Sequence, residues 1–407
     1  MNISHALLSI KRYGTKGLVN WLKRCLFGSD LEIQLKKTAI KSPEHKPIKG
    51  ITLIGDFTPQ KGSLCKVVND IDIALSASDI PHQIYDVAAS QHDGFAINRF
   101  SHIIGMFGVP NVHYKGCQLF RIAFWEFESG FLNYYPYFSE GTPVLVLTDF
   151  CKTSLQKQLP QSIPVHKILY PFSFKPNKII DPDTMRQNLG LAKDDFCVFF
   201  NFDYRSGFNR KNPEGVLRAF AQSLKEKPNA KLVFKTMRSK TNPDSFQRLH
   251  ALAKDLGIEN RLIEITDFIS NDELIGLTNA CDVYISLHRG EGFGLGIAEA
   301  MSLGKAVIVS DYSATTEFCN ANNSIPIPCK FIAPRPDQMD IDNYKNVTSW
   351  ADPDIPSAAK ALKRLYEDRD YRIKLGENAK SFIDEYFALS NFKKSVLDFL
   401  SQTSPLT

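Results

Sequence analysis

Hydrophobic and polar positions alternate along the chain in blocks that predict strands followed by helices. Short apolar runs rich in β-branched and aromatic residues occur at 51–54, 82–86, 121–125, 144–148 and 165–170, and again at 196–200, 231–235, 261–265, 281–287 and 305–310. Runs of this length and composition are typical of buried strands in a parallel sheet. Helical spacing between them predicts an α/β fold with helices on both faces of each sheet.

The expected helices divide the chain into two units. They lie at 63–78, 149–158, 214–226, 244–256, 271–279, 296–303, 356–368, 370–386 and 390–401. A turn-rich link with Pro176 and Pro182 separates the two groups of strands. We therefore expect Rossmann-like domains at 50–175 and 176–389, followed by a C-terminal helix within 390–407. A chain of 407 residues is long enough for two cores.

The first 49 residues differ from the rest in charge. They hold ten Lys and Arg against three acids, whereas the net charge of the whole chain is only +5. Leu18, Trp21, Leu22, Cys25 and Leu26 form one apolar helical stripe. This basic amphipathic extension and linker (1–49) either lies on an anionic membrane surface or packs on the body of the protein.

The composition limits the cellular compartments and the partners that fit this chain. Eight scattered cysteines include no C-x-x-C pair, which disfavours a zinc site and favours a reducing compartment. No apolar run approaches the roughly 18 residues of a membrane span, and no apolar core precedes Lys11 as in a cleaved signal peptide. We expect a cytoplasmic protein, peripheral on the inner face of the membrane if 1–49 binds lipid. The body beyond residue 49 has no basic excess to attract nucleic acid.

The candidate chemistry gathers in residues 286–318. Glycines at every second position, 290 to 296, follow the strand at 281–287 and precede the helix at 296–303. Backbone N–H groups at such a loop suit a phosphate. Glu291 and Glu299, with seven residues between them, bracket the loop and suit a hydroxyl-rich ligand. The combination describes a sugar nucleotide.

This stretch resembles the E-x7-E signature of GT4-type retaining glycosyltransferases (glycosyltransferases group 1). The resemblance rests on HRGEGFGL at 288–295, EAM at 299–301 and residues 313–318. It does not fit the dinucleotide motif G-x-G-x-x-G, because the sixth position counted from Gly290 is Leu295. The resemblance implies a GT-B fold, with two Rossmann-like domains facing a central cleft and a C-terminal helix that returns to the first domain.

The resemblance also implies roles for individual residues. Glu291 would contact the transferred sugar and Glu299 the ribose. Arg205 and Lys211 would hold the diphosphate, with Arg210 an adjacent rival for either role. Backbone amides for the donor would come from Gly292, Phe293, Gly294 and Leu295. His288 is either a donor ligand or a strand-end histidine that caps the loop.

Two weaker features concern the acceptor and a metal. Trp125 and Glu126 resemble a WE pair in some relatives and would face the acceptor, the alternative being a buried aromatic with a satisfied carboxylate. Asp-x-Asp triplets at 70–72, 181–183, 340–342 and 352–354 fit turns and helix caps better than metal chelation. We expect no metal and no cofactor.

The resemblance implies a hexosyltransferase-type enzyme that retains anomeric configuration without a metal. Its partners would be a nucleotide-sugar donor and a glycan or lipid-linked acceptor, in cell-surface polysaccharide or glycolipid synthesis. The family's mechanism is same-face attack, in which the departing phosphate helps to take the acceptor's proton. Two alternatives remain open: a non-catalytic GT-B partner or glycan-binding subunit, and a sugar-nucleotide epimerase of the same fold.

Overall fold

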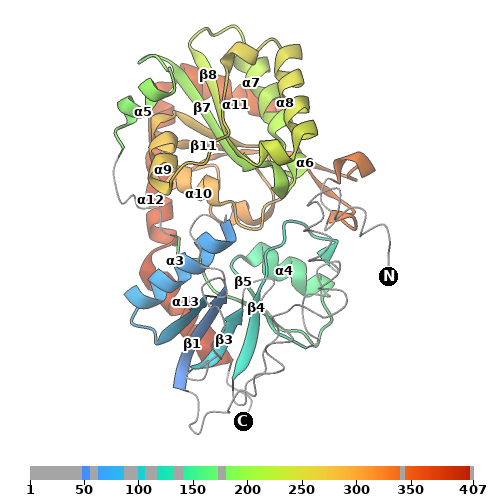
Figure 1. Cartoon of the computed structure of the whole chain (residues 1–407), viewed down its shortest axis with the longest axis vertical. Helices are drawn as coiled ribbons and strands as arrows, with labels where there is room; N and C mark the ends of the chain where they lie inside the picture. Colours follow the sequence, from blue (N-terminus) through green and yellow to red (C-terminus); the bar gives the residue numbers. More distant parts are fainter. Residues whose placement is uncertain are drawn as a thin grey trace.

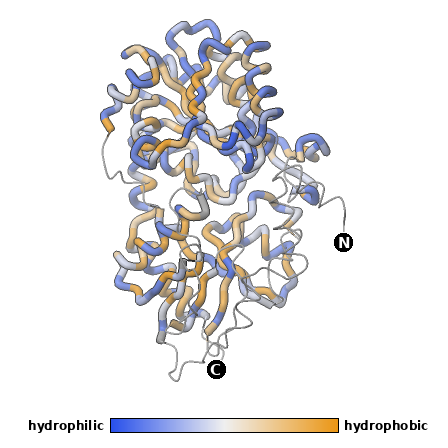
Figure 2. The backbone as a smooth tube through the Cα atoms, in the orientation of Figure 1, coloured by the Kyte–Doolittle hydropathy of each residue, from blue (hydrophilic) through white to orange (hydrophobic). Residues whose placement is uncertain are grey.

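The chain folds into two lobes, each built on a parallel sheet (Figure 1). The computed structural model describes residues 48–55, 63–86, 100–105, 117–131, 141–172, 180–339 and 344–403. The basic extension at 1–47 lies outside the described residues, as does the triplet 340–342. Hydrophobic residues concentrate along the central strands of both lobes (Figure 2), because these strands are buried on both faces.

The first lobe contains a six-stranded sheet in the order β2-β1-β3-β4-β5-β6. Its strands are β1 (Ile48–Gly55), β2 (His82–Asp86), β3 (Phe100–Gly105), β4 (Gln118–Ile122), β5 (Val144–Val146) and β6 (Val165–Lys167). Helices α3 (Ser63–Ala77) and α4 (Asp149–Gln158) accompany it. The sequence patterns did not predict β3, whose apolar run is interrupted by the buried Ser101 and His102.

The second lobe contains the other six-stranded sheet, in the order β12-β11-β10-β7-β8-β9. Its strands are β7 (Phe196–Asp203), β8 (Ala230–Met237), β9 (Leu262–Ile265), β10 (Val283–Ser286), β11 (Ala306–Ser310) and β12 (Ile325–Ile327). Its helices are α5 (Pro182–Asn188), α6 (Phe208–Lys211), α7 (Pro213–Leu224), α8 (Pro243–Asp255), α9 (Asn271–Ala280), α10 (Leu295–Ser302), α11 (Ile355–Glu367) and α12 (Arg369–Tyr386).

Two features connect the lobes. Helix α13 (Leu389–Gln402) follows α12 and packs on α3 and β6 of the first lobe, as predicted for the C-terminal helix (Figure 1). A two-stranded antiparallel ribbon, β13 (Cys329–Ile332) and β14 (Trp350–Pro353), extends from the second lobe. Sequence patterns predict no strand here, where β13 and β14 form a separate two-stranded sheet.

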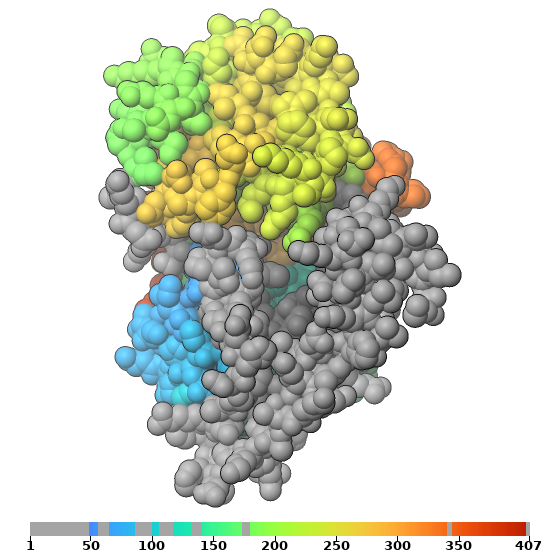
Figure 3. Space-filling model, in the orientation of Figure 1, coloured from blue at the N-terminus to red at the C-terminus, as the bar shows by residue number. Residues whose placement is uncertain are grey.

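The α/β, two-sheet architecture confirms the predicted fold class. In the space-filling view the surface of the second lobe, green to orange, lies above that of α3, blue (Figure 3). Across the part of the chain that the structure describes, every helix is too short or too polar to cross a membrane.

Candidate functional site

A cavity of about 690 Å³ lies where the two lobes face each other. The second lobe contributes the carboxyl ends of β7, β8 and β10 and the glycine loop that begins α10. The first lobe contributes α3, the segment 123–126 that follows β4, and Tyr170. Ligands of open α/β sheets bind at the carboxyl ends of strands, so the cavity is the candidate site.

The glycine loop approaches the first lobe so closely that a side chain would not fit. A Cβ at Gly290 would lie 2.5 Å from the backbone oxygen of Glu126. Gly294, the N-cap of α10, has a φ of +94°, a conformation that favours glycine. Residues 291–297, which run from the loop into α10, line the cavity.

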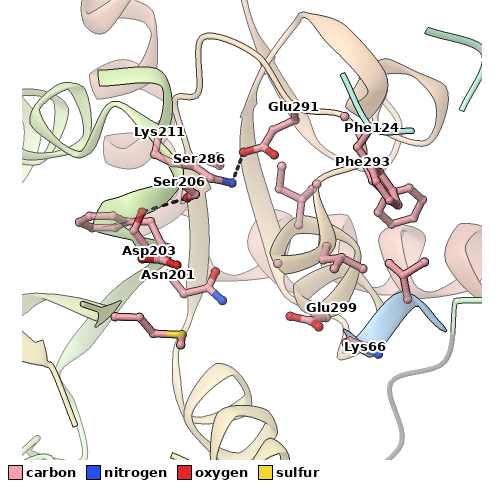
Figure 4. A pocket seen from close by; sticks show the side chains of 18 of the residues that line it. Lys66, Phe124, Asn201, Asp203, Ser206, Lys211, Ser286, Glu291, Phe293 and Glu299 are labelled. Atoms are coloured by element: carbon pink, nitrogen blue, oxygen red, sulfur yellow. Dashed lines mark hydrogen bonds and ion pairs between the residues drawn. The ribbon is translucent and has the colours of Figure 1, made fainter. Parts of the chain in front are cut away.

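Glu291 forms a buried charge cluster with Lys211 and Arg210, and Figure 4 shows its contact with Lys211. Its carboxylate accepts a hydrogen bond from Lys211 Nζ, and Arg210 Nη1 lies 3.3 Å from Oε2. Burial alone would raise the pKa of Glu291, but Lys211 and Arg210 together lower it to about 2. The Glu291 N–H donates to Ser313 Oγ at 2.9 Å, which fixes the loop from the side of β11. Glu291 is therefore ionised and held in one orientation.

The structure places Arg210, and not Arg205, beside Lys211. Arg205, in the short turn after β7, is exposed and is not among the residues that line the cavity. The side chain of Arg210 is 4% exposed, and it donates to the backbone oxygens of Ser206 at 2.7 Å and Gly290 at 2.7 Å. The expectation that Arg205 and Lys211 hold the diphosphate stays a prediction, and the guanidinium that lies with Lys211 at Glu291 is that of Arg210, the adjacent rival.

Glu299 faces the cavity from α10, about one helical turn beyond the loop (Figure 4). Burial raises its pKa to about 7, with Lys66 acting to lower it and Asp70 to raise it. Lys66 and Asp70 come from α3 of the first lobe, and an ion pair of 2.7 Å joins them. Sequence reasoning missed Lys66 and considered Asp70 only as part of an Asp-x-Asp triplet, since nothing in α3 indicates that the helix faces the second lobe.

The remaining donor-side predictions divide into lining and supporting residues. Those that line the cavity are Gly292, Phe293, Gly294 and Leu295. His288 is fully buried behind the loop, where its ring contacts Ser286 Oγ at 3.1 Å and the backbone oxygen of Tyr312 at 3.3 Å. Burial lowers the pKa of His288 to about 4, so the ring is neutral. This arrangement matches the loop-capping alternative for His288.

The two acceptor-side candidates differ in position. Trp125 is fully buried and donates from Nε1 to the backbone oxygen of Ser129 at 3.0 Å. Glu126 lines the cavity with its side chain 18% exposed, and Oε1 lies 3.7 Å from Arg210 Nη2. Burial raises the pKa of Glu126, although Arg210 acts against this. Glu126 thus places a first-lobe carboxylate beside the second-lobe cations, whereas Trp125 belongs to the core.

The aspartate triplets among the described residues cap helices or form ion pairs. Asp181 and Asp354 accept hydrogen bonds from backbone N–H groups at the starts of α5 and α11. Asp70 pairs with Lys66, and Asp352 pairs with Arg289. No group of three His, Cys, Asp or Glu side chains among the described residues is arranged to hold a metal ion.

Comparison with known families and proteins places the second lobe in context. Residues 183–382 match the family model described as glycosyl transferases group 1. A segment of 111 residues is 32% identical to the serotype-specific mannosyltransferase WbdA of Escherichia coli, covering 26% of this chain and 13% of that protein. A segment of 173 residues is 28% identical to D-inositol 3-phosphate glycosyltransferase of Corynebacterium jeikeium, covering 42% of this chain and 36% of that one. These matches span well under half of each relative.

Solved GT-B structures share the fold over most of the chain. HepE of Anabaena, in complex with UDP and glucose, superposes with a TM-score of 0.61 at 15% identity, covering 88% of this chain and all of that one. WaaG, a glycosyltransferase involved in lipopolysaccharide biosynthesis, gives 0.58 at 16% identity, covering 87% of this chain and 100% of that one. Sucrose-phosphate synthase from Thermosynechococcus elongatus superposes with a TM-score of 0.60 at 14% identity, covering 87% of this chain and 99% of that one.

Proposed function

We propose that the protein is a retaining glycosyltransferase that moves a hexosyl group from a nucleotide-sugar donor to a glycan or lipid-linked acceptor. This proposal rests on the set of charged residues that line the cavity between the lobes. The cavity holds Glu291 with Lys211 and Arg210 at the loop, and Glu299 on the helix that follows. The family-model match over the same residues supports the assignment to sugar transfer.

Each part of this site suits one part of a nucleotide sugar. A carboxylate accepts hydrogen bonds from hydroxyls, so Glu291 would bind the sugar and Glu299 the ribose. Lys211 and Arg210 would stabilise the negative charge that grows on the leaving diphosphate. The cavity volume of about 690 Å³ lies within the range of roughly 300–1,000 Å³ common for small-molecule sites.

The proposed mechanism needs no side chain as nucleophile. The bond between the anomeric carbon and the phosphate oxygen breaks, and the acceptor oxygen attacks from the same face. The departing phosphate takes the acceptor's proton, so the products are a glycoside with retained configuration and a nucleoside diphosphate. Because Lys211 and Arg210 supply positive charge at the diphosphate, the proposed reaction requires no metal ion.

The setting and partners are also part of this proposal. The name of WbdA describes a serotype-specific mannosyltransferase, and WaaG takes part in lipopolysaccharide biosynthesis. We therefore place the reaction in cell-surface polysaccharide or glycolipid synthesis, on the cytoplasmic side. Residues 1–49 would hold the enzyme against an anionic membrane surface.

The stereochemistry of donor hydrolysis tests this proposal without knowledge of the acceptor. Proton NMR would record the first-formed anomer of the sugar released to water, with EDTA present and then with Mn²⁺. We expect the donor's own anomer and equal rates in both conditions. Release of the opposite anomer would refute retention, and a requirement for Mn²⁺ would refute metal independence. A product formed from the donor alone without loss of the nucleotide would indicate an epimerase.

A further inference from the structure

Residues 344–353, which we call the clasp, belong to the second lobe in sequence, but three of their side chains pack on the first. Tyr344, Val347 and Trp350 are 5%, 5% and 1% exposed. They share one apolar cluster with first-lobe side chains, including Trp125, Phe127 and Phe131. The clasp therefore completes a core that neither lobe has alone.

Backbone contacts fix the position of the clasp. The Thr348 N–H donates to Ser129 Oγ at 3.0 Å. Gly130 has a φ of +86°, and a Cβ there would lie 2.8 Å from the backbone nitrogen of Val347. At its other end, Trp350 lies 5.2 Å beneath the Arg289 guanidinium, which also contacts Asp352 at 3.0 Å.

Tyr344 brings the clasp to the edge of the cavity. Its ring packs edge-on against Trp125 and Phe127, with centroids 5.9 and 5.1 Å apart. Its hydroxyl is hydrogen-bonded to Glu126, and its ring lies 5.9 Å from Arg210 Cζ. One side chain thus touches the first-lobe carboxylate and the second-lobe cation that together flank Glu291.

We propose that Tyr344 is a positioning residue that sets Glu126 against Arg210 and thereby fixes where an acceptor hydroxyl meets the donor. This inference rests on the proposed function. Glu126 would hold the acceptor oxygen, since it is the cavity-lining carboxylate that reaches the cations from the first lobe. Tyr344 itself would contact neither substrate.

The substitution Tyr344→Phe tests the role of the hydroxyl while keeping the ring in the core. We expect an unchanged donor dissociation constant, because the proposed donor contacts lie in the second lobe. Turnover of the best donor from a panel of UDP-, GDP-, dTDP- and ADP-sugars should fall about tenfold, as expected when a hydrogen bond to a charged group is lost. Tyr366→Phe is the matched control, because its hydroxyl donates to Asn229 Oδ1 at 2.8 Å, away from the cavity.

The pH dependence of turnover distinguishes a positioning role of Tyr344 from a general loss of activity in the variant. Glu126 faces Arg210, Lys211, Glu291 and Tyr344, and Cys151 lies near it. The Tyr344 hydroxyl lowers the pKa of Glu126, so its removal should shift the acid limb of turnover to higher pH. An unshifted limb with normal turnover would overturn the proposal. If the wild-type protein turned over no donor, the proposed function itself would fail.

A second measurement tests the clasp without any turnover. Small-angle scattering would compare Gly130→Leu with Gly190→Leu, which also has a positive φ, +67°, but no neighbour within 4 Å of a Cβ. We expect a larger radius of gyration for Gly130→Leu alone, because the added side chain pushes the clasp off the first lobe. Equal radii for the two variants would overturn the interlobe role of the clasp.

Discussion

Glu291 and Glu299 face the same cavity, but their surroundings shift their pKa values in opposite directions. Both carboxylates are buried, which by itself raises the pKa. Lys211 and Arg210 overcome this effect at Glu291, whereas Lys66 does not overcome it at Glu299. Glu291 is thus ionised at neutral pH, and Glu299 is close to the midpoint of its titration. Two environments of this kind indicate two different tasks for the same side-chain type.

The raised pKa of Glu299 predicts pH-dependent donor binding. If the ribose hydroxyls bind the ionised carboxylate, protonation competes with the donor. The affinity for the donor should then be constant above pH 7. Below pH 7 it should decrease, by up to about tenfold for each pH unit. Calorimetric titration from pH 5.5 to 8.5 would measure this, with Glu299→Gln as the comparison. The variant should bind weakly with a flat profile. An identical pH dependence in both proteins would exclude Glu299 as the titrating group.

The ion pairs of Glu291 predict a stability effect. Its pKa of about 2 lies below the ordinary 4.5, so its contribution to folding is present above pH 4.5 and is lost as the pH falls toward 2. Glu291→Gln leaves two buried cations without their partner and should cost about 3 kcal/mol. Thermal unfolding at pH 7 and pH 3 would show a large difference from wild type at pH 7 and a smaller one at pH 3. An equal difference at both values would contradict the pKa assignment.

At the scale of elements, helix α13 adds buried side chains to the core of the first lobe. Phe399 is 3% exposed and packs against His102 and Phe120, with ring centroids 5.6 and 4.8 Å apart. His102 also contacts the Thr403 hydroxyl at 2.9 Å. The helix therefore covers the polar residue that interrupts β3, which explains how a buried histidine is tolerated there.

Truncation of Phe399 tests this packing. Phe399→Ala should destabilise the protein by about 3–5 kcal/mol, because the surrounding rings cannot fully close the cavity. Leu397→Ala on the same helix is the control, since that side chain is 45% exposed and its loss should cost less than about 1 kcal/mol. Chemical denaturation would measure both. Similar losses for the two variants would indicate that α13 is held by something other than its buried face.

Sequence patterns could predict the elements whose signals are local. The run after β10 was readable because strand, glycines, Glu291 and Glu299 follow one another within a short stretch. β3 is not predicted because Ser101 and His102 break its apolar run. Ser101 is hydrogen-bonded to His102, whose partner Thr403 lies some 300 residues away. The ribbon β13–β14 was missed because its strands are short and largely exposed on β13.

At the scale of the whole molecule, the site is made by the way the lobes face each other. Glu126, Lys66 and Tyr344 reach the cavity or its edge only because two distant parts of the chain are brought together. No local pattern marks Lys66 or Tyr344, and Glu126 is marked only by the Trp125–Glu126 pair. Sequence spacing favours Arg205 for the same reason, although Arg210 is the cation that lies beside Glu291. The donor half of the site was predictable, and the interlobe half required the tertiary structure.

Nucleotide-sugar turnover by the intact chain tests the central claim most directly. Release of nucleoside diphosphate would be followed across UDP-, GDP-, dTDP- and ADP-sugars with EDTA present, for wild type and for Glu291→Gln. We predict turnover of one nucleotide class by the wild type, with at least about a hundredfold loss in the variant, as for the removal of a preorganised charged group. Binding and turnover of no donor by a folded wild-type protein would contradict the account and would favour a non-catalytic partner subunit.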